Sequence, residues 1–315
     1  MAKAKKSETA QTKETIVENP EVYINPLTDF GFKRIFGEEA NKDLLIDFLN
    51  AVLKVKGGIK DLQYTNTERK GRIKTDKTTV FDLHCTTGKG ERIIVEVQNH
   101  AHKNIRERVV YYASRSIQEQ GKGGNKWKYN LCPVYSVNIG NFYLDKTDKK
   151  DPTSTKYMTY VKLADIETHR VFYDKLTIVY IELPRFKKEL EELQDNVERW
   201  VYLFRHLPQL DNVPKTLRRN KVFQKLFEQA KIANMTPEEY NEYNQSLKNY
   251  RQMNIVVDEY KETIAAKNKT ISAMRKKHVQ TIAVHINTIA AKDDALQKAL
   301  ARIAELERKA GLNKT

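Results

Sequence analysis

The chain has few cysteines and no long apolar segment. Only Cys85 and Cys132 occur among its 315 residues, too few for a disulfide framework or a cysteine-based zinc site, so we expect a protein of a reducing cytoplasm. No run approaches the roughly 18 apolar residues of a membrane helix. Residues 1–6 carry charge without an apolar segment behind them, unlike a secretory signal. We therefore expect neither a membrane protein nor a secreted one.

Other signatures are missing too, and acidic residues are in the minority. The chain contains no P-loop, GxSxG or GxGxxG pattern. Lys and Arg number 56 against 41 Asp and Glu, a formal net charge of +15. Such a surplus favours polyanionic partners, because contacts to phosphates release bound counterions. Charge alone fits equally well a basic protein without a nucleic-acid partner, so a second observation is needed.

Apolar periodicity and turn residues indicate how the chain is organised. Residues 1–20 are rich in Lys, Glu and Thr without an apolar period, and we expect them to be disordered. The pattern predicts helices over residues 41–53, 104–120 and 186–207, and strands near residues 59–66, 79–86, 91–98, 133–139 and 176–183. This order of elements indicates a mixed α/β layer rather than a barrel or sandwich.

The C-terminal stretch differs from the rest, because residues 238–310 contain neither Gly nor Pro. Its apolar residues recur in imperfect heptads that Arg275 and Lys292 interrupt. They are Ile264, Ile271, Ile282, Ile289, Leu296, Leu300, Ile303 and Leu306. We predict a long helix or coiled-coil arm that joins copies of the chain into a homodimer or higher oligomer. The alternative is a solvated, charged helix without a partner.

Two neighbouring segments, residues 79–86 and 91–98, alternate apolar and polar side chains around a Gly-containing turn. This pattern predicts a β-hairpin. With the turn centred near Gly88 and Lys89, the numbers of paired residues sum to about 178, which places Asp82 opposite Glu96. A slip of one residue would bury both carboxylates, so the pattern favours the register that keeps the apolar face inward and the carboxylates outward.

The opposed carboxylates have a chemical consequence. Directly opposed residues of a hairpin have Cβ atoms about 4.5–5.5 Å apart. Two carboxylates at that distance repel each other unless a cation lies between them, and a divalent metal with oxygen ligands meets this need. Ordinary acids on a surface hairpin are the alternative. His84, His100 and His102 lie nearby in the sequence, but their spacing matches no zinc pattern.

Several segments, taken in order, resemble the PD-(D/E)XK nuclease family transposases, which are related to recombination-promoting nucleases. The resemblance covers about residues 23–205, with a weaker continuation at 238–250. It rests on residues 28–37, 41–53, 80–82, 94–98, 108–115, 128–135 and 174–186. It implies a restriction-endonuclease-like α/β core with a helical extension and tail. The chain then divides into a disordered tail (1–20), a nuclease core (21–185), a helical accessory region (186–237) and the arm (238–315).

The resemblance also implies a site and an activity. Asp82 and Glu96 would bind Mg²⁺, with Mn²⁺ as a substitute, together with the backbone carbonyl of Val97 and with Asp29 as a further candidate ligand. Asp29 has an alternative role as a helix cap. Gln98 stands where the superfamily has Lys; its amide orients water but supplies no positive charge. The implied activity is metal-dependent cleavage of DNA phosphodiester bonds, linked to recombination or mobile elements.

Four basic side chains are candidates for phosphate contacts: Lys33, and Arg106, Arg108 and Arg115 of the predicted helix that follows the hairpin. A solvated helix face with intrahelical ion pairs is the alternative for the three arginines. Gln98 and the long arm also suit a DNA-binding or assembly protein that has lost its catalysis. A nuclease acting on RNA stays open as well, because backbone contacts do not distinguish the two polymers.

Overall fold

The structure is a computed structural model that describes residues 21–65, 68–69, 79–80, 82–122, 128–145, 156–309 and 311. At residues 68–69 and 79–80 it describes only the backbone. The predicted disorder of residues 1–20 lies outside this part of the chain, and so does Phe81 of the predicted strand 79–86, an apolar residue that the alternation assigns to the inward face.

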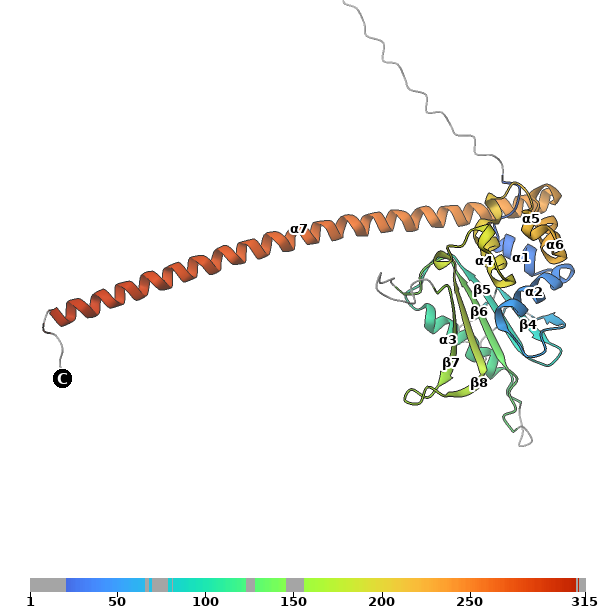
Figure 1. Cartoon of the computed structure of the whole chain (residues 1–315), viewed down its shortest axis with the longest axis horizontal. Coiled ribbons are helices and arrows are strands. Elements are labelled where there is room, and N and C mark those ends of the chain that lie inside the picture. Colours follow the sequence, from blue (N-terminus) through green and yellow to red (C-terminus); the bar gives the residue numbers. More distant parts are fainter. Residues whose placement is uncertain are drawn as a thin grey trace, which may run out of the picture. The chain divides into compact units, whose positions relative to one another are not determined.

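A six-stranded mixed sheet forms the centre of the fold, in the order β1-β4-β5-β6-β8-β7 (Figure 1). The strands are β1 (Leu62–Tyr64), β4 (Leu83–Thr87), β5 (Arg92–Gln98), β6 (Val134–Gly140), β7 (Met158–Ala164) and β8 (Val171–Glu182). Strands β5, β6 and β8 run parallel, whereas β1, β4 and β7 pair antiparallel with their neighbours. A separate ladder joins β2 (Glu68–Arg69) and β3 (Thr79–Val80). The α/β prediction is confirmed.

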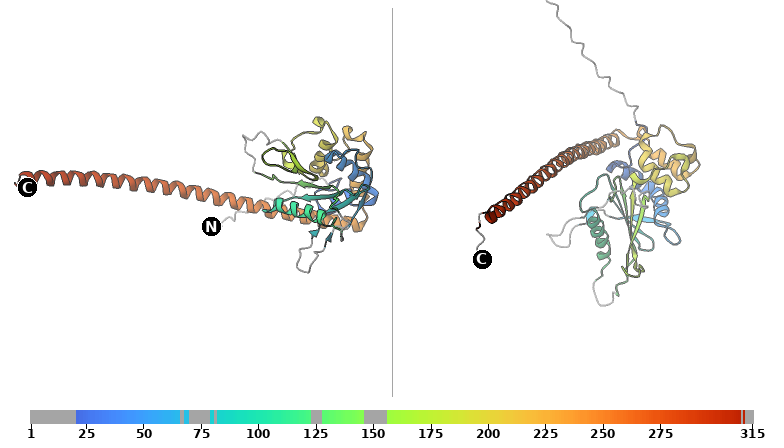
Figure 2. Two further views of the ribbon diagram at one scale, coloured as in Figure 1. Left: turned by 90° about the horizontal axis from the view of Figure 1, so that it is seen from below. Right: turned by 60° about the vertical axis from the view of Figure 1, so that its left-hand side comes forward.

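Helices cover both faces of the sheet (Figures 1 and 2). On one face, α3 (Ile105–Gln118) packs Val109 against Ile178 and Tyr180 of β8. On the other, α1 (Asp29–Phe36), α2 (Lys42–Leu53), α4 (Asn196–His206) and α6 (Lys221–Ala230) surround an aromatic cluster. Its rings are those of Phe36, Phe48, Trp200, Phe204 and Phe223. Short helical turns complete the unit: η1 (Glu39–Asn41), η2 (Leu183–Arg185), η3 (Leu190–Glu192), η4 (Leu207–Gln209), α5 (Lys215–Arg218) and η5 (Ile232–Asn234).

Thr28 caps α1, so the capping role considered for Asp29 belongs to its neighbour. The Thr28 hydroxyl accepts a hydrogen bond from the Gly31 amide at 3.0 Å. Asp29 is consequently the first residue of the helix. Gly31 is required by close packing, because a Cβ at this position would lie 2.0 Å from the Asn25 carbonyl oxygen.

The predicted helix over residues 186–207 is wrong in its first half. Helix α4 begins only at Asn196, where the Asp195 carboxylate accepts a hydrogen bond from the Glu198 amide at 2.9 Å. Upstream, Glu189 and Glu192 form a reciprocal capping box around η3. Local side-chain caps therefore divide an apolar pattern that otherwise reads as one continuous helix. The edge strand β7 was also not predicted, because it has a mostly exposed surface.

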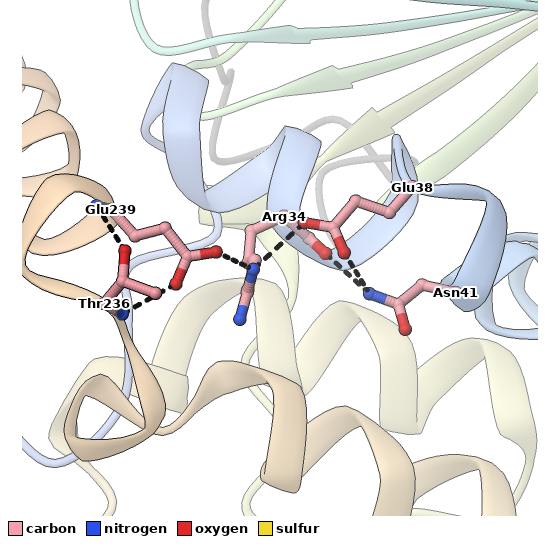
Figure 3. A network of polar contacts seen from close by, with 5 residues as sticks. All are labelled: Arg34, Glu38, Asn41, Thr236 and Glu239. Carbon is pink, nitrogen blue, oxygen red and sulfur yellow. Dashed lines mark hydrogen bonds and ion pairs between the residues drawn. The ribbon is translucent and has the colours of Figure 1, made fainter.

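Helix α7 (Pro237–Lys309) begins against the core. Thr236 and Glu239 form its capping box: the Glu239 amide donates to the Thr236 hydroxyl at 3.2 Å, and the Thr236 amide donates to the Glu239 carboxylate at 2.9 Å (Figure 3). Glu239 also pairs with Arg34 of α1, which in turn binds Glu38 at 3.2 Å (Figure 3). The start of α7 is thereby fixed to α1.

The first turns of α7 continue this packing. Tyr243 is 1% exposed, and its hydroxyl accepts a hydrogen bond from the Asn25 amide at 3.0 Å. Leu247 is also buried, and the Ser246 hydroxyl accepts from the Phe30 amide at 3.1 Å. The first compact unit accordingly ends at Lys248. The first turns of α7 thus belong to this compact unit, and the functional division of the chain at residue 238 stays a prediction.

The second unit comprises residues 249–315, of which the structure describes 249–309 and 311. Residues 249–309 belong to α7, and their large apolar side chains are exposed, among them Ile264, Ile282 and Leu296. The predicted long helix is therefore confirmed. Within the described ranges, no helix combines the length and apolar character needed to cross a membrane.

We expect a protein that ends at Asn234 to be less stable than one that ends at Lys248. The shorter chain loses the buried side chains of Tyr243 and Leu247 and leaves Arg34 without Glu239. Full burial of such side chains contributes about 1.5–3 kcal/mol each. Urea unfolding measures the difference, with a chain ending at Lys276 as the control for removing exposed helix. Equal midpoints for all three chains would contradict the packing role of residues 237–248.

Candidate active site

Strands β4 and β5 pair in the predicted register. Leu83 lies opposite Val95 and Cys85 opposite Ile93, so that the numbers of each pair sum to 178. Asp82 directly precedes β4 and Glu96 lies within β5. Their contact is direct: the Asp82 amide donates to Glu96 Oε1 at 3.3 Å, and the Val97 amide donates to Asp82 Oδ2 at 2.7 Å. The two carboxylates predicted to face each other are therefore brought together.

The predicted outward, solvated position of the two carboxylates is wrong: Glu96 is buried and Asp82 is partly buried. Glu96 is 2% exposed, because α3 covers this side of the sheet. His84 shares the face and is also buried, with its ring nitrogens near the hydroxyls of Thr65 at 2.5 Å and Ser116 at 3.3 Å. The site is thus enclosed between sheet and helix, where charge–charge interactions are stronger than in water.

Polar residues continue across the sheet from Glu96. Asn138 of β6 is in register with Glu96, and Tyr180 of β8 is in register with Asn138. Both are buried, and the Asn138 Oδ1 and Tyr180 hydroxyl atoms have no hydrogen-bond partner among the described residues. Sequence reasoning missed this row. Its signal was available in β6, where Ser136 and Asn138 alternate with apolar residues at the two-residue period of a strand.

The surroundings raise the proton affinity of the carboxyl pair. Burial, and next the negative charge of Asp82, raise the pKa of Glu96 to about 8. Burial likewise raises the pKa of Asp82, although the hydrogen bond from the Val97 amide opposes the effect. At neutral pH the pair therefore retains a proton. A divalent cation binding there would replace that proton, since carboxylates bind metals in their ionised form.

Arg108 of α3 supplies positive charge to this pair. Its Nη2 atom donates to Glu96 Oε2 at 3.2 Å, and its guanidinium lies 4.9 Å from the centre of the Tyr112 ring. The Arg108 side chain is 38% exposed, whereas that of Glu96 is 3% exposed. The sequence predicts phosphate contacts for Arg108, whereas the structure pairs it with Glu96, a candidate metal ligand. The guanidinium connects the buried carboxylates to the protein surface.

Gln98 follows two residues after Glu96 and is partly buried. Neither its amide oxygen nor its amide nitrogen has a hydrogen-bond partner among the described residues. An unsatisfied buried polar group costs about 1–3 kcal/mol. The amide is therefore suited to bind a water molecule or a ligand beside the two carboxylates.

The donor set fits a hard divalent cation. Asp82 and Glu96 offer carboxylate oxygens, the ligand type that Mg²⁺ prefers. The Val97 amide points toward Asp82, and in an extended strand the carbonyl of the same residue points to the same side. Asp29 lies near this set, since its negative charge adds to burial in raising the pKa of Asp82. Its carboxylate is 69% exposed and pairs with Lys33 at 2.9 Å, and its role as a further ligand stays a prediction. In the part of the chain that the structure describes, no three His, Cys, Asp or Glu side chains converge as a metal cluster.

The remaining candidates for phosphate contacts are engaged or enclosed. Lys33 binds Asp29, and Arg106 binds Asp145 at 2.7 Å with both side chains largely exposed. Arg115 is 7% exposed and therefore lies on the packed side of α3. Arg108, Lys103 and Tyr111 are among the side chains that line an open depression of about 750 Å³ at the start of α3. Arg108 thus contacts Glu96 and also lines this open depression.

Comparison with protein families gives a match over residues 26–260, to the family described as PD-(D/E)XK nuclease family transposase. The match continues beyond residue 205 and into α7, further than the sequence resemblance suggested. Neither the curated proteins nor the solved structures provide a match. The mixed α/β sheet agrees with the fold of this family. The chain belongs to the PD-(D/E)XK nuclease family transposases.

Proposed function

We propose that the protein is a Mg²⁺-dependent endonuclease that hydrolyses DNA phosphodiester bonds, in the context of recombination or mobile DNA. The observation that carries the proposal is the enclosed pair of Asp82 and Glu96, which share raised pKa values and an all-oxygen donor set. When bound, the ion would lower the pKa of a water molecule and offset charge on the phosphate. The net charge of +15 supports a polyanionic substrate.

The side chains of the site have separate roles in this proposal. Asp82, Glu96 and the Val97 carbonyl would hold the ion. The unpaired Gln98 amide orients the attacking water or a phosphate oxygen, since it has both a donor and an acceptor free. Gln98 cannot neutralise the additional negative charge of the transition state. Arg108 does so, because its guanidinium already lies at the carboxylates and reaches the surface.

Cleavage of supercoiled plasmid tests the proposal. We expect nicked or linear product with Mg²⁺ or Mn²⁺ and none with EDTA. Asp82→Ala removes one of the two carboxylates and should abolish product formation. A structured RNA of similar length, incubated in parallel, distinguishes DNA from RNA as the substrate. Undiminished cleavage by Asp82→Ala would place the chemistry elsewhere.

The pairing of Arg108 with Glu96 also favours a second candidate, a DNA-binding or assembly protein without catalysis. In that case the guanidinium permanently satisfies the carboxylate that would otherwise bind metal. Plasmid that shifts in a gel but stays intact at every metal concentration would support this second candidate over the endonuclease.

We further propose that the arm joins two or more copies of the chain. Ile282, Ile289, Leu296 and Ile303 recur every seven residues, and all four side chains are about half exposed. A long helix with such a stripe gains stability by burying it against a copy.

Sedimentation equilibrium of the full chain and of a chain ending at Lys248 tests this self-association. We expect an oligomer for the full chain and a monomer for the shorter one. Replacing Ile289 and Leu296 by Asn in the full chain should also give monomers. Monomeric mass for the full chain would contradict the proposal.

A further inference from the structure

The helical layer contains a basic groove that none of the predicted site residues line. Its volume is about 600 Å³, and η3, α4 and α5 contribute the lining. Four of the lining side chains are cations, Arg199, Lys215, Arg218 and Arg219, whereas Glu191 is the single acid among them. We refer to these four cations as the groove cations.

The groove cations differ from the other basic residues considered above. Within the described residues, none of the ion pairs includes a groove cation, although Arg199 lies near the Glu198 carboxylate that Lys188 binds. Lys33, Arg106 and Arg108, by contrast, each bind a carboxylate. Unneutralised cations in a concave surface generate a strong positive potential. The positive charge of the groove is therefore not neutralised by ion pairs among the described residues, unlike that of Lys33, Arg106 and Arg108.

The local fold holds these side chains in place. Leu217 is fully buried and anchors α5 against α6, so that the neighbouring positions face outward. Lys215, Arg218 and Arg219 are exposed and have the three- and four-residue spacing of one helical face. Two hydrogen bonds orient the arginines: Arg199 donates to Asn196 Oδ1 at 2.8 Å, and Arg218 donates to the Val213 carbonyl at 3.1 Å.

We propose that this groove binds the sugar–phosphate backbone of duplex DNA and anchors it to the protein, separately from the carboxylate site. Arg and Lys are the side chains that contact phosphates most often, and the Thr216 hydroxyl in the same groove is a further donor. Such contacts are independent of base sequence. The inference rests on the proposed function only in taking DNA as the substrate. An acidic protein segment is the competing occupant.

DNA affinity tests the groove without relying on cleavage. The reference is the full chain with Glu96→Gln, in EDTA, and the probe is a fluorescein-labelled 20-base-pair duplex followed by anisotropy. Adding Lys215→Gln, Arg218→Gln and Arg219→Gln should raise Kd about tenfold or more at 0.1 M salt. The slope of log K against log salt should fall by about 2–3, because about 0.9 counterions are released per phosphate contact.

A matched variant controls for net charge. Lys267→Gln, Lys269→Gln and Lys276→Gln remove the same charge from exposed positions of α7. We expect less than a twofold change in Kd for this variant. An equal loss of affinity in both variants would mean that net charge, not the groove, determines DNA binding. An unchanged Kd in the groove variant would mean that the groove does not bind DNA and would favour an acidic protein segment as its occupant. Either result overturns the proposal.

Kinetics with intact carboxylates add a second test. Neutralising Lys215, Arg218 and Arg219 should raise the DNA concentration for half-maximal rate about tenfold while leaving the saturated single-turnover rate unchanged. A reduced saturated rate would assign these residues to the chemical step and contradict an anchoring role. If the wild-type chain does not cleave DNA, the proposed function fails, yet the anisotropy comparison still decides the groove.

Discussion

Glu96→Gln is expected to abolish cleavage and, in the absence of metal, to stabilise the folded protein at alkaline pH. The activity should fall by about 10³-fold or more, because an amide does not replace an ionised carboxylate as a ligand of a hard cation. DNA binding should persist. A substitution that abolishes activity but stabilises the fold is typical of a functional residue that is unfavourable for folding when no ligand is bound.

The sign of the stability effect follows from the pKa of Glu96, which burial and Asp82 raise from 4.5 to about 8. Between these two values the unfolded chain has an ionised carboxylate and the folded chain retains the proton. Raising the pH through this window therefore favours the unfolded state. Glutamine removes the titration, so the variant should gain roughly 2–4 kcal/mol over wild type at pH 8 and little at pH 5.

Urea unfolding in EDTA at pH 5 and pH 8 measures this difference. Glu107→Gln is the matched control, since Glu107 lies on α3 with an exposed side chain. The control should cleave DNA at the wild-type rate and follow the wild-type pH profile. Wild-type stability that rises between pH 5 and pH 8 would contradict the enclosed, repelling carboxylate pair.

Arg108→Gln is the second large effect and should lower the cleavage rate about 10²-fold with little change in DNA affinity. The guanidinium is the cation that contacts Glu96, and loss of one charge-stabilising donor costs about 10²–10³ in rate. Arg106→Gln is the control on the same helix, because Arg106 pairs with exposed Asp145 instead of the carboxylate site. We expect less than a threefold change for the control.

A double variant that moves the positive charge from position 108 to position 98 tests whether this charge is what the reaction needs. Gln98 has an unpaired amide two residues after Glu96, so Gln98→Lys introduces an ammonium group beside the carboxylates. In the Arg108→Gln background, this change should recover at least about tenfold of the lost rate. Equal defects in Arg106→Gln and Arg108→Gln, or a defect that appears only in Kd, would assign Arg108 to phosphate binding alone.

The hairpin of β4 and β5 is an example of what local sequence determines. A turn of fixed length sets the register of an antiparallel pair, and side-chain alternation selects one of two faces. The pairing of Leu83 with Val95, and with it the position of Asp82 near Glu96, followed from residues 79–98 alone. Helices α2, α3 and α7 were predictable for the same reason, because their apolar periodicity lies within one segment.

Helix boundaries that depend on side-chain caps were not predictable from apolar periodicity. The stretch before α4 has an apolar period but is divided by the Asp195 cap and the Glu189–Glu192 box. Thr28, not Asp29, caps α1. Such caps depend on single hydrogen bonds whose formation is decided by the direction in which the chain enters and leaves each helix.

Tertiary structure decided the electrostatics of the site. The sequence by itself determined that two carboxylates share one face of a hairpin, whereas the packing of α3 over that face buried Glu96 and brought Arg108 to it. Asn138 and Tyr180 joined the same row through parallel pairing of distant strands. A pKa depends on every charge and every layer of protein around a group, so it is a property of the assembled fold, while register is a property of the turn.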